Sequence, residues 1–480
     1  MKDIDIIFNQ KKIMVIGLGV TGIPVARKLK DLGNHIIVFD NNTGIDRDII
    51  YSDIGKNGRG SLEIILAGQE AVDTSILKEV GLIIASPGIA AENTMLQAAM
   101  EREIIIWDEL ELSWQLLNDR QKSNTIAVTG TNGKTTVVNL IGAILAGGAM
   151  NVRVCGNVGS PLINTISINE KLKGADDDDG IRIIEISSFQ LERTYTFRPR
   201  TAILLNITSD HMDRHRNIED YADIKLRLFS NQRRGDFAIV NIDDNLTAEK
   251  IFNMENSVNG PSLIKYSIEK KEGAHIWYRD GGIYYNFFSH KGTINIKCAL
   301  LNGMHNISNA MAASAASLIG GADPEKIGKS IRDFEPLSHR MEYLGEIAGI
   351  RCINDSKSTN PDSTAAALKD YSKEVTLIMG GKDKDMDFMA LTASLKSAVN
   401  DLILIGESAS RIEELFKGRK DVYNIYRCES LEEAVRLGFR VTTPGDVLLL
   451  SPACASMDMF RDYKDRGDRF KNIVMSFKEK

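Results

Sequence analysis

The segment IAVTGTNGKTTVVNL (126–140) combines a β-branched run, two glycines, a lysine and two adjacent threonines. This order is typical of a strand, a phosphate-binding loop and a helix. Gly130 and Gly133 let backbone N–H groups approach phosphate, Lys134 adds a positive charge, and Thr135 places a hydroxyl where Mg²⁺ is commonly held. The loop is shorter than the general G-x-x-x-x-G-K-[ST] pattern. The segment still predicts a nucleotide-phosphate site.

Two further segments carry groups that suit a divalent cation. In RIIEISSFQLE (182–192), Glu185 lies near the end of an apolar strand, where an unpaired carboxylate is costly and a cation would remove that cost. A surface or salt-bridged glutamate is the alternative. LNITSDHMDRH (205–215) gathers carboxylates with two histidines, among them His211, although each alone could be structural. On the helix predicted next, Lys225 has the pattern of an ordinary surface lysine.

The N-terminal GLGVTG (17–22) follows one predicted strand, and Asp40 ends the next. This spacing fits a dinucleotide-binding turn with a ribose-binding acid, and so predicts an NAD-dependent dehydrogenase as one alternative. The pattern itself indicates only an anionic ligand and does not identify it as NAD, because a glycine turn at a helix start accepts any anionic group. The polar turn ASPGIA (85–90) fits a nucleotide or nucleotide-sugar cleft. A tight turn without a ligand is the plainer interpretation.

Three series of short apolar runs must position these groups. Strands are predicted at KIMVIGLG, HIIVFD, GLIIAS and REIIIW, then at TIAVTG, IRIIEIS and TAILLNIT, then at VTLIMGG, LILIGES and DVLLLSPA. Because helical patterns separate them, we expect parallel α/β sheets with ligands at the carboxyl ends of the strands. We place domain boundaries near residues 108 and 336. The stretch 262–298 alternates with turn signals and predicts antiparallel strands.

Composition restricts the class of protein. A chain of 480 residues is too long to fold around a single hydrophobic core, so we expect several domains. Its content of 43% hydrophobic and 26% charged residues indicates a globular protein. The net charge of −6 argues against general nucleic-acid binding. Five scattered cysteines without a C-x-x-C pair fit a reduced cytoplasm without structural zinc. No signal peptide is evident, and the uncharged stretches contain too much glycine and asparagine for membrane spans.

The motifs together resemble one family, the Mur ligases, over residues 12 to 472. The motifs that carry the resemblance are GTNGKTT (130–136), EISSFQLE (185–192), DHMDRH (210–215), GMHNISNA (303–310), LSHR (337–340) and NDSKSTNP (354–361). These enzymes use ATP to build the peptide stem of bacterial peptidoglycan. GLGVTG, GGKDKDMDF (380–388) and LLSPACASMDMFRDYKDRG (449–467) are most similar to the members that add D-glutamate to UDP-N-acetylmuramoyl-L-alanine.

The resemblance implies three domains: a Rossmann-like domain for the UDP substrate at 1–108, a central P-loop ATPase α/β domain with a small antiparallel sheet at 109–336, and a Rossmann-like amino-acid-binding domain at 337–480. It reassigns GLGVTG from NAD to the UDP of the substrate. It also implies a cytoplasmic bacterial enzyme, which we expect to be a monomer without membrane insertion or nucleic-acid binding.

Specific roles follow from the resemblance. Mg²⁺, with two ions expected, would be held by Thr135, Glu185, His211 and Lys225, the last as a lysine carbamylated by CO₂. The expected ATP-binding residues are Gly130, Thr131, Asn132, Gly133, Lys134, Thr135, Thr136, Asn306, Asn309, Arg340 and Asp355. The catalytic set would be Lys134, Glu185, His211, Lys225, Arg340 and Lys357.

The substrate contacts follow in the same way. The UDP substrate would meet Val20, Thr21, Asp40, Asn41, Ser86, Asn157 and Ser187. D-glutamate would meet Lys384, Thr359, Ser456 and the backbone near Tyr463. Without the resemblance, Lys384 has the pattern of a solvated loop residue. Ser358 stands where many relatives have alanine, and the run 40–42 lacks a basic residue found in some of them.

The implied reaction forms an acyl phosphate on the L-alanyl carboxylate, which the amine of D-glutamate then attacks. Two Mg²⁺ ions with Lys134, Arg340 and Lys357 are the expected stabilisers of negative charge. The alternatives are a related ligase that adds L-alanine, a diamino acid, or glutamate to a folate, and, from other classes, the NAD-dependent dehydrogenase and a nucleotide-binding switch.

Overall fold

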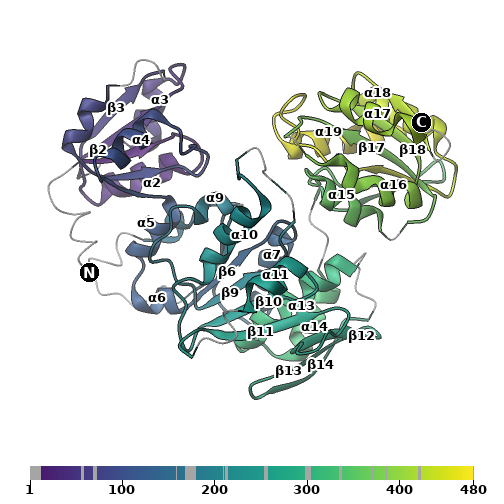
Figure 1. Ribbon diagram of the computed structural model, residues 1–480, viewed down its shortest axis with the longest axis horizontal. Coiled ribbons are helices and arrows are strands. Elements are labelled where there is room, and N and C mark those ends of the chain that lie inside the picture. The colour runs from purple at the N-terminus through teal and green to yellow at the C-terminus, as the bar shows by residue number, and fades with distance from the viewer. Residues whose placement is uncertain are drawn as a thin grey trace. The chain divides into compact units, whose positions relative to one another are not determined.

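The computed structural model describes residues 12–55, 59–68, 73–157, 159–167, 180–208, 210, 214–252, 258–297, 304–334, 338–369, 371–384, 386–419 and 423–478. The chain divides into two units. The first unit comprises Met1–Asn206, Tyr221–Asn295 and Ala310–Ser330, and the second comprises Ile207–Asp220, Ile296–Asn309 and Ile331–Lys480. The described residues form three sheets in these units, as the three strand series predicted (Figure 1).

The first sheet has the order β3-β2-β1-β4-β5, and every pair of neighbours is parallel. Its elements are β1 (Lys12–Ile16), α2 (Gly22–Asp31), β2 (Ile36–Asp40), α3 (Arg47–Ile54), β3 (Leu62–Leu66), η2 (Thr74–Glu79), β4 (Val80–Ala85), α4 (Thr94–Glu101) and β5 (Ile105–Trp107). The strand order reverses between β1 and β4, so the turns after these two strands form the expected ligand-binding edge. The prediction missed β3, whose residues are only partly buried.

The second sheet, also in the first unit, has the order β14-β13-β12-β11-β10-β9-β6-β8-β7. Its strands are β6 (Thr125–Thr129), β7 (Val152–Gly156), β8 (Ile181–Glu185), β9 (Thr201–Leu204), β10 (Phe237–Asn241), β11 (Ser262–Ser267), β12 (Ile276–Arg279), β13 (Gly282–Phe287) and β14 (His290–Asn295). The helical elements along this part of the chain are α5 (Glu109–Leu116), α6 (Asp119–Ser123), α7 (Lys134–Gly147), η3 (Leu162–Thr165), α9 (Ser188–Leu191), α10 (Ile218–Leu226), η4 (Arg227–Phe229), α11 (Asn245–Lys250), α13 (Met304–Ile319) and α14 (Pro324–Arg332).

The prediction that residues 262–298 form antiparallel strands was partly wrong. Among its described residues, only β12, β13 and β14 pair in an antiparallel manner, whereas β11 runs parallel to β10 and to β12. The connection from β10 through α11 lets β11 continue the parallel sheet. Alternation of apolar residues along β11 indicates which face of the strand is buried. It does not indicate whether the strand runs parallel or antiparallel to its neighbours.

The third sheet, in the second unit, has the order β15-β16-β20-β17-β18-β19, parallel except at β15. Its elements are β15 (Glu342–Ile347), β16 (Ile350–Asn354), α15 (Pro361–Leu368), β17 (Val375–Gly380), η5 (Phe388–Leu391), α16 (Thr392–Ala398), β18 (Val399–Ile405), α17 (Ala409–Phe416), η6 (Lys417–Arg419), β19 (Asn424–Arg427), α18 (Leu431–Val441), β20 (Val447–Leu450) and α19 (Tyr463–Ser476). Two apolar clusters take alternate residues of β17 and β20, so both faces of this sheet are covered.

The carboxyl ends of β6, β8 and β9 in the second sheet, and of β16, β20 and β17 in the third, carry most of the predicted site residues. Among the described helices, none has the length and apolar character needed to cross a membrane. The domain boundaries near residues 108 and 336 stay predictions.

Candidate active site

The phosphate loop leaves β6 and enters α7, as the sequence predicted. Gly130 has φ 148° and Gly133 has φ 88°, which are backbone conformations that favour glycine. Lys134 begins α7, and its Nζ donates hydrogen bonds of 2.7 Å to the carbonyls of Gly130 and Thr131. The lysine charge is thus held over the loop. Its neighbours Thr135 and Thr136 are buried in the first helical turn.

Asn206, which follows β9, supports this loop and was not among the predicted site residues. Its carbonyl accepts the N–H of Thr131 at 2.9 Å, and its Oδ1 accepts the N–H of Asn132 at 2.8 Å. Its Nδ2 donates back to the carbonyl of Asn132 at 3.1 Å. The only signal in the sequence was an asparagine at the end of an apolar strand.

Glu185 is the last residue of β8 and is 1% exposed. Its Oε1 accepts a hydrogen bond of 3.1 Å from Nδ2 of Asn157, and its Oε2 has no hydrogen-bond partner among the described residues. An unsatisfied buried carboxylate oxygen is costly, and a divalent cation is the partner that would remove this cost. Ser187, two residues on, caps α9 by accepting the N–H of Gln190. Asn157 and Ser187, both predicted substrate contacts, therefore flank Glu185.

Lys225 is 1% exposed, so the surface position indicated by its helical pattern was wrong. Its Nζ donates a hydrogen bond of 3.0 Å to the carbonyl of Gly130, and it lies 4.4 Å from the ring centroid of Tyr221. Because Lys134 donates to the same carbonyl, the fold brings both lysines to the phosphate loop. The pattern failed because the face of α10 that packs inward depends on tertiary contacts.

His211 lies outside the described residues, so the second predicted metal position is not described. Within the described part of the chain, no group of three or more histidine, cysteine, aspartate or glutamate side chains converges to hold a metal ion. The fit to Mg²⁺ rests on the unpartnered oxygen of Glu185, on Thr135 at the start of α7, and on buried Lys225.

The glycine turn after β1 is tightly built. The hydroxyl of Ser86 donates to the carbonyl of Gly17 at 2.9 Å, and a Cβ on Gly22 would lie 1.8 Å from that carbonyl oxygen. Asp40 accepts the N–H of Leu18 at 2.7 Å and the N–H of Asn42 at 2.9 Å. Asp40 therefore braces the turn and has a structural role besides the predicted contact with the nucleoside.

The other residues near the glycine turn that are predicted to contact the UDP substrate differ in solvent exposure. Val20 is 79% exposed and Thr21 is half-buried, so both are accessible beside the turn. Oδ1 of Asn41 is buried without a hydrogen-bond partner among the described residues, and this amide oxygen needs a donor.

In the second unit, Asp355 follows β16 and is buried. Its Oδ2 accepts the hydroxyl of Ser451 at 2.8 Å, and its Oδ1 accepts the N–H of Met341 at 3.2 Å. Burial raises the pKa of Asp355 to about 6, although its hydrogen bonds and the charge of Arg340 act in the opposite direction. The predicted residues Arg340 and Asp355 thus act on one another.

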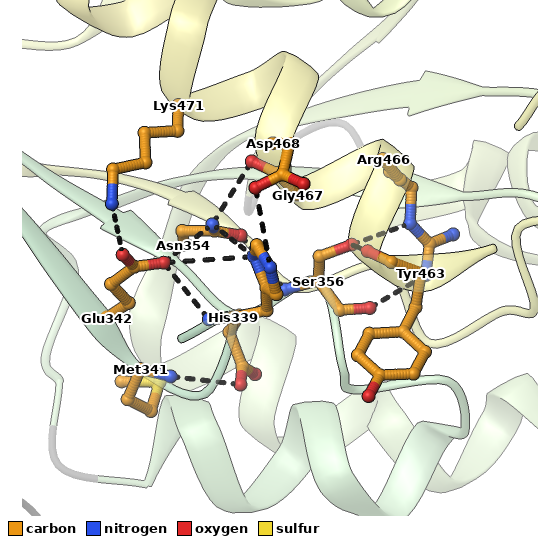
Figure 2. A network of polar contacts seen from close by, with 11 residues as sticks. His339, Met341, Glu342, Asn354, Ser356, Tyr463, Arg466, Gly467, Asp468 and Lys471 are labelled. Carbon is orange, nitrogen blue, oxygen red and sulfur yellow. Dashed lines mark hydrogen bonds and ion pairs between the residues drawn. The ribbon is translucent and has the colours of Figure 1, made fainter. Parts of the chain in front are cut away.

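Lys357 and Tyr463 are also brought together. The Nζ of Lys357 donates to the Tyr463 hydroxyl at 3.0 Å and lies 4.1 Å from the ring centroid. Arg466, which the prediction missed, lies one turn further along α19 and is fully buried. It donates to the hydroxyl and carbonyl of Ser356 at 3.0 and 2.9 Å and to the carbonyl of Cys454. It therefore joins the NDSKSTNP loop to the SPACAS segment. Figure 2 shows its contacts with Ser356.

His339 supports the same loop from the other side, as Figure 2 shows. It has φ 65°, its Nδ1 lies 3.0 Å from Nδ2 of Asn354, and its carbonyl accepts the N–H of Lys357 at 3.0 Å. A Cβ on Gly467 would lie 2.3 Å from the His339 ring, so glycine permits this contact. His339 and Gly467 lie far apart in sequence, so no local sequence pattern could predict this contact.

The predicted D-glutamate contacts lie on segments joined by the backbone. The N–H of Lys382 donates to the carbonyl of Ala455 at 2.8 Å, which places the loop of Lys384 against the segment of Ser456. Lys384 and Thr359 are half-buried, and Ser456 is buried. Asn306 and Asn309 lie in the first two turns of α13, half-buried and buried respectively.

A pH-dependent stability is expected from Asp355. A carboxyl whose pKa is about 6 in the folded protein and about 4 when unfolded binds more protons when folded between these values, so its ionisation destabilises the fold as pH rises. Asp355→Asn should therefore stabilise the second unit at pH 8 by up to about 3 kcal/mol, with the gain shrinking toward pH 4. Scanning calorimetry at both pH values measures this, and an equal effect at both would contradict it.

Three family models match the chain. They are the Mur ligase MurD-like N-terminal domain at residues 11–108, the Mur ligase middle domain at 128–317, and the Mur ligase glutamate ligase domain at 339–454. The chain is 39% identical over 473 residues to the UDP-N-acetylmuramoylalanine–D-glutamate ligase of Pelotomaculum thermopropionicum, covering 98% of this chain and 99% of the relative. It is 37% identical to the protein of that name from Geotalea daltonii, covering 97% of each.

Solved structures are similar in fold. MurF from Acinetobacter baumannii has a TM-score of 0.60 at 15% identity, covering 97% of this chain and 93% of the other. UDP-N-acetylmuramate-alanine ligase MurC from Thermotoga maritima has a TM-score of 0.57 at 18% identity, covering 97% and 99%. At these identities the similarity concerns the fold alone.

Proposed function

The chain belongs to the Mur ligase family, and from this we infer that it joins D-glutamate to UDP-N-acetylmuramoyl-L-alanine, with conversion of ATP to ADP and phosphate, in peptidoglycan precursor synthesis. The observation that carries this inference is the 39% identity to a D-glutamate ligase across nearly the whole of both chains. Because the match covers 98% of this chain, it includes the C-terminal segments that are expected to select the amino acid. The dehydrogenase alternative receives no support, since the matching N-terminal model is that of a Mur ligase.

The reaction needs an activated carboxylate, because a carboxylate and an amine do not condense in water. An oxygen of the L-alanyl carboxylate attacks the γ-phosphorus of ATP, the bond to ADP breaks, and an acyl phosphate forms. The glycine loop and Lys134 are suited to this step, since backbone N–H groups and an ammonium stabilise the negative charge on the transferred phosphoryl group.

The D-glutamate amine then attacks the acyl carbon, the bond from that carbon to the phosphate oxygen breaks, and phosphate leaves as the amine loses a proton. Arg340, Asp355 and Lys357 are the proposed groups around the transferred phosphate. Lys384 and Thr359 are proposed for the side-chain carboxylate of D-glutamate, where an ammonium and a hydroxyl make charge-assisted hydrogen bonds. Ser456 and the backbone near Tyr463 are proposed for its α-carboxylate.

We propose that Mg²⁺ is held by Glu185, Thr135 and a carbamylated Lys225, with His211 at a second position. The unpartnered buried oxygen of Glu185 and the burial of Lys225 support this donor set. When bound, Mg²⁺ neutralises phosphate charge and orients the nucleotide. A monomeric state and a cytoplasmic location stay predictions.

Phosphate release with UDP-N-acetylmuramoyl-L-alanine and a panel of D- and L-amino acids tests the function. We expect turnover with D-glutamate, and roughly a hundredfold higher KM for D-glutamate in Lys384→Ala, because a charged partner of a carboxylate is lost. Lys382→Ala is the matched control, since this lysine is on the same loop with an exposed side chain. Turnover with another amino acid in place of D-glutamate would contradict the proposed substrate, and unchanged KM in Lys384→Ala would contradict the role of that residue.

A further inference from the structure

Arg193 is a largely buried charge that none of the proposed steps uses. It lies two residues after α9, the helix capped by Ser187, and is 9% exposed. Its Nη2 donates a hydrogen bond of 2.8 Å to the carbonyl of Ile89, which is 104 residues earlier in the chain. A side chain from the segment between α9 and β9 thus holds the ASPGIA turn that follows β4 of the first sheet.

The turn held by Arg193 is part of the proposed UDP-substrate subsite. The N–H of Ile89 donates to the carbonyl of Ser86 at 3.0 Å, and the Ser86 hydroxyl donates to the carbonyl of Gly17. A Cβ on Gly17 would lie 3.2 Å from Cδ1 of Ile89, so the side chain of Ile89 packs closely beside the glycine turn. Movement of Ile89 would therefore be transmitted to both turns of this subsite.

The hydrogen bond from Arg193 to Ile89 lies beside a cavity. A cavity of about 570 Å³ adjoins it, lined by Leu96, Ile105 and Trp107 from the first sheet and its helices and by Tyr195 beyond α9. The side chains around β5 and those of the segment after α9 leave this space unfilled. Arg193 is among the residues that line it, so its hydrogen bond crosses a loosely packed region.

Asp108 and Arg193 also interact through their charges, and this interaction must be separated from the hydrogen bond to Ile89. This aspartate is fully buried and caps α5 by accepting the N–H of Glu111 at 2.9 Å. The positive charge of Arg193 acts to lower its pKa, against the larger effect of burial, which raises it. Arg193 could therefore serve only to neutralise Asp108. The hydrogen bond to Ile89 has a different consequence, because it fixes the position of a turn that the substrate is proposed to contact.

We propose that Arg193 is a positioning residue that sets the distance between the Ser86 turn and the Ser187 turn, and so determines affinity for the UDP-linked substrate. This inference rests on the proposed function of these turns. Both turns are expected to contact one extended ligand, so a fixed separation lowers the cost of ordering them when the ligand binds. ATP and D-glutamate are bound by other segments and should not depend on this separation.

The test compares Arg193→Met, Arg193→Lys, Asp108→Asn and the double variant Arg193→Met with Asp108→Asn. Arg193→Met should raise KM and the calorimetric Kd for UDP-N-acetylmuramoyl-L-alanine roughly tenfold, as expected for loss of a charged hydrogen bond. KM for ATP and for D-glutamate should stay within about twofold of wild type. Arg193→Lys, which keeps one donor, should recover part of the affinity.

Asp108→Asn alone should bind the UDP substrate like the wild type, because asparagine also caps a helix. The double variant should bind as weakly as Arg193→Met, which would support positioning. Recovery of affinity in the double variant, or an equal rise of all three KM values in Arg193→Met, would overturn the proposal. The binding measurement does not require turnover, so weaker binding in Arg193→Met upholds this inference even if ligation of D-glutamate fails. If the wild type does not bind the UDP substrate, the proposed function and this inference both fail.

Discussion

Replacement of Lys134 with methionine is expected to lower kcat by roughly 10²–10³-fold, the loss typical of removing one preorganised donor at developing charge. The Nζ of Lys134 lies 2.7 Å from two carbonyls of the loop that is proposed to surround the phosphates. Lys134 is the first residue of α7, so its ammonium is a charged donor at the helix start, where the phosphate is proposed to bind. Methionine keeps most of the side-chain volume and removes the charge. Phosphate release at saturating ATP measures the effect.

Two further variants test whether the expected loss of kcat is specific to the charge of Lys134. Lys78→Met, at an exposed position in η2, should leave kcat unchanged. Lys134→Arg keeps the charge but changes the donor geometry, so we expect a smaller loss than with methionine. Affinity for the UDP substrate should stay within about twofold in all three, because that ligand is proposed to bind elsewhere. A Lys134→Met protein that retains more than about a tenth of wild-type kcat would contradict the assignment.

The local motifs of the nucleotide site could be predicted because each lies within a few residues of sequence. The strand, glycine loop and helix from β6 to α7 form one continuous unit, and Glu185 closes a strand whose apolar run is complete in itself. In a parallel sheet the ends of neighbouring strands meet, so the predicted strand series also predicted which loops share an edge. The glycine turn after β1 followed from the same reasoning.

Other features depend on distant partners and were missed for that reason. Arg466 is held by Ser356, which is 110 residues earlier, and Asn206 supports a loop more than 70 residues before it. The direction of β11 depends on its pairing with β10, which residue alternation along one strand does not encode. Ser187 and Arg193 are close in sequence, yet the link from Arg193 to the ASPGIA turn follows only from the fold.

Lys225 shows most clearly how burial changes the chemistry expected of a side chain. A buried ammonium is costly in a low-dielectric interior, and Lys225 has the Gly130 carbonyl and the Tyr221 ring as described neighbours. Addition of CO₂ to its neutral amine, with loss of a proton, would replace this cation with a carbamate whose two oxygens share one negative charge close to the phosphate loop. Such oxygens are the ligands that Mg²⁺ prefers. Burial thus supports the carbamylated state that the family resemblance implied.

Lys225→Met is therefore expected to lower kcat by at least about 10²-fold, comparable to loss of an electrostatic stabiliser, and added bicarbonate should not restore it. Wild-type protein exchanged into buffer depleted of CO₂ should lose activity and recover it with bicarbonate, with a matching gain of one CO₂ in its intact mass. Lys326→Met, at an exposed position in α14, is the control and should respond to bicarbonate like the wild type. Full activity in depleted buffer, with the unmodified mass, would mean that Lys225 acts as an amine. Its ammonium would then add to the positive charge of Lys134 at the loop, and Glu185 would have to hold Mg²⁺ without an anionic partner from α10.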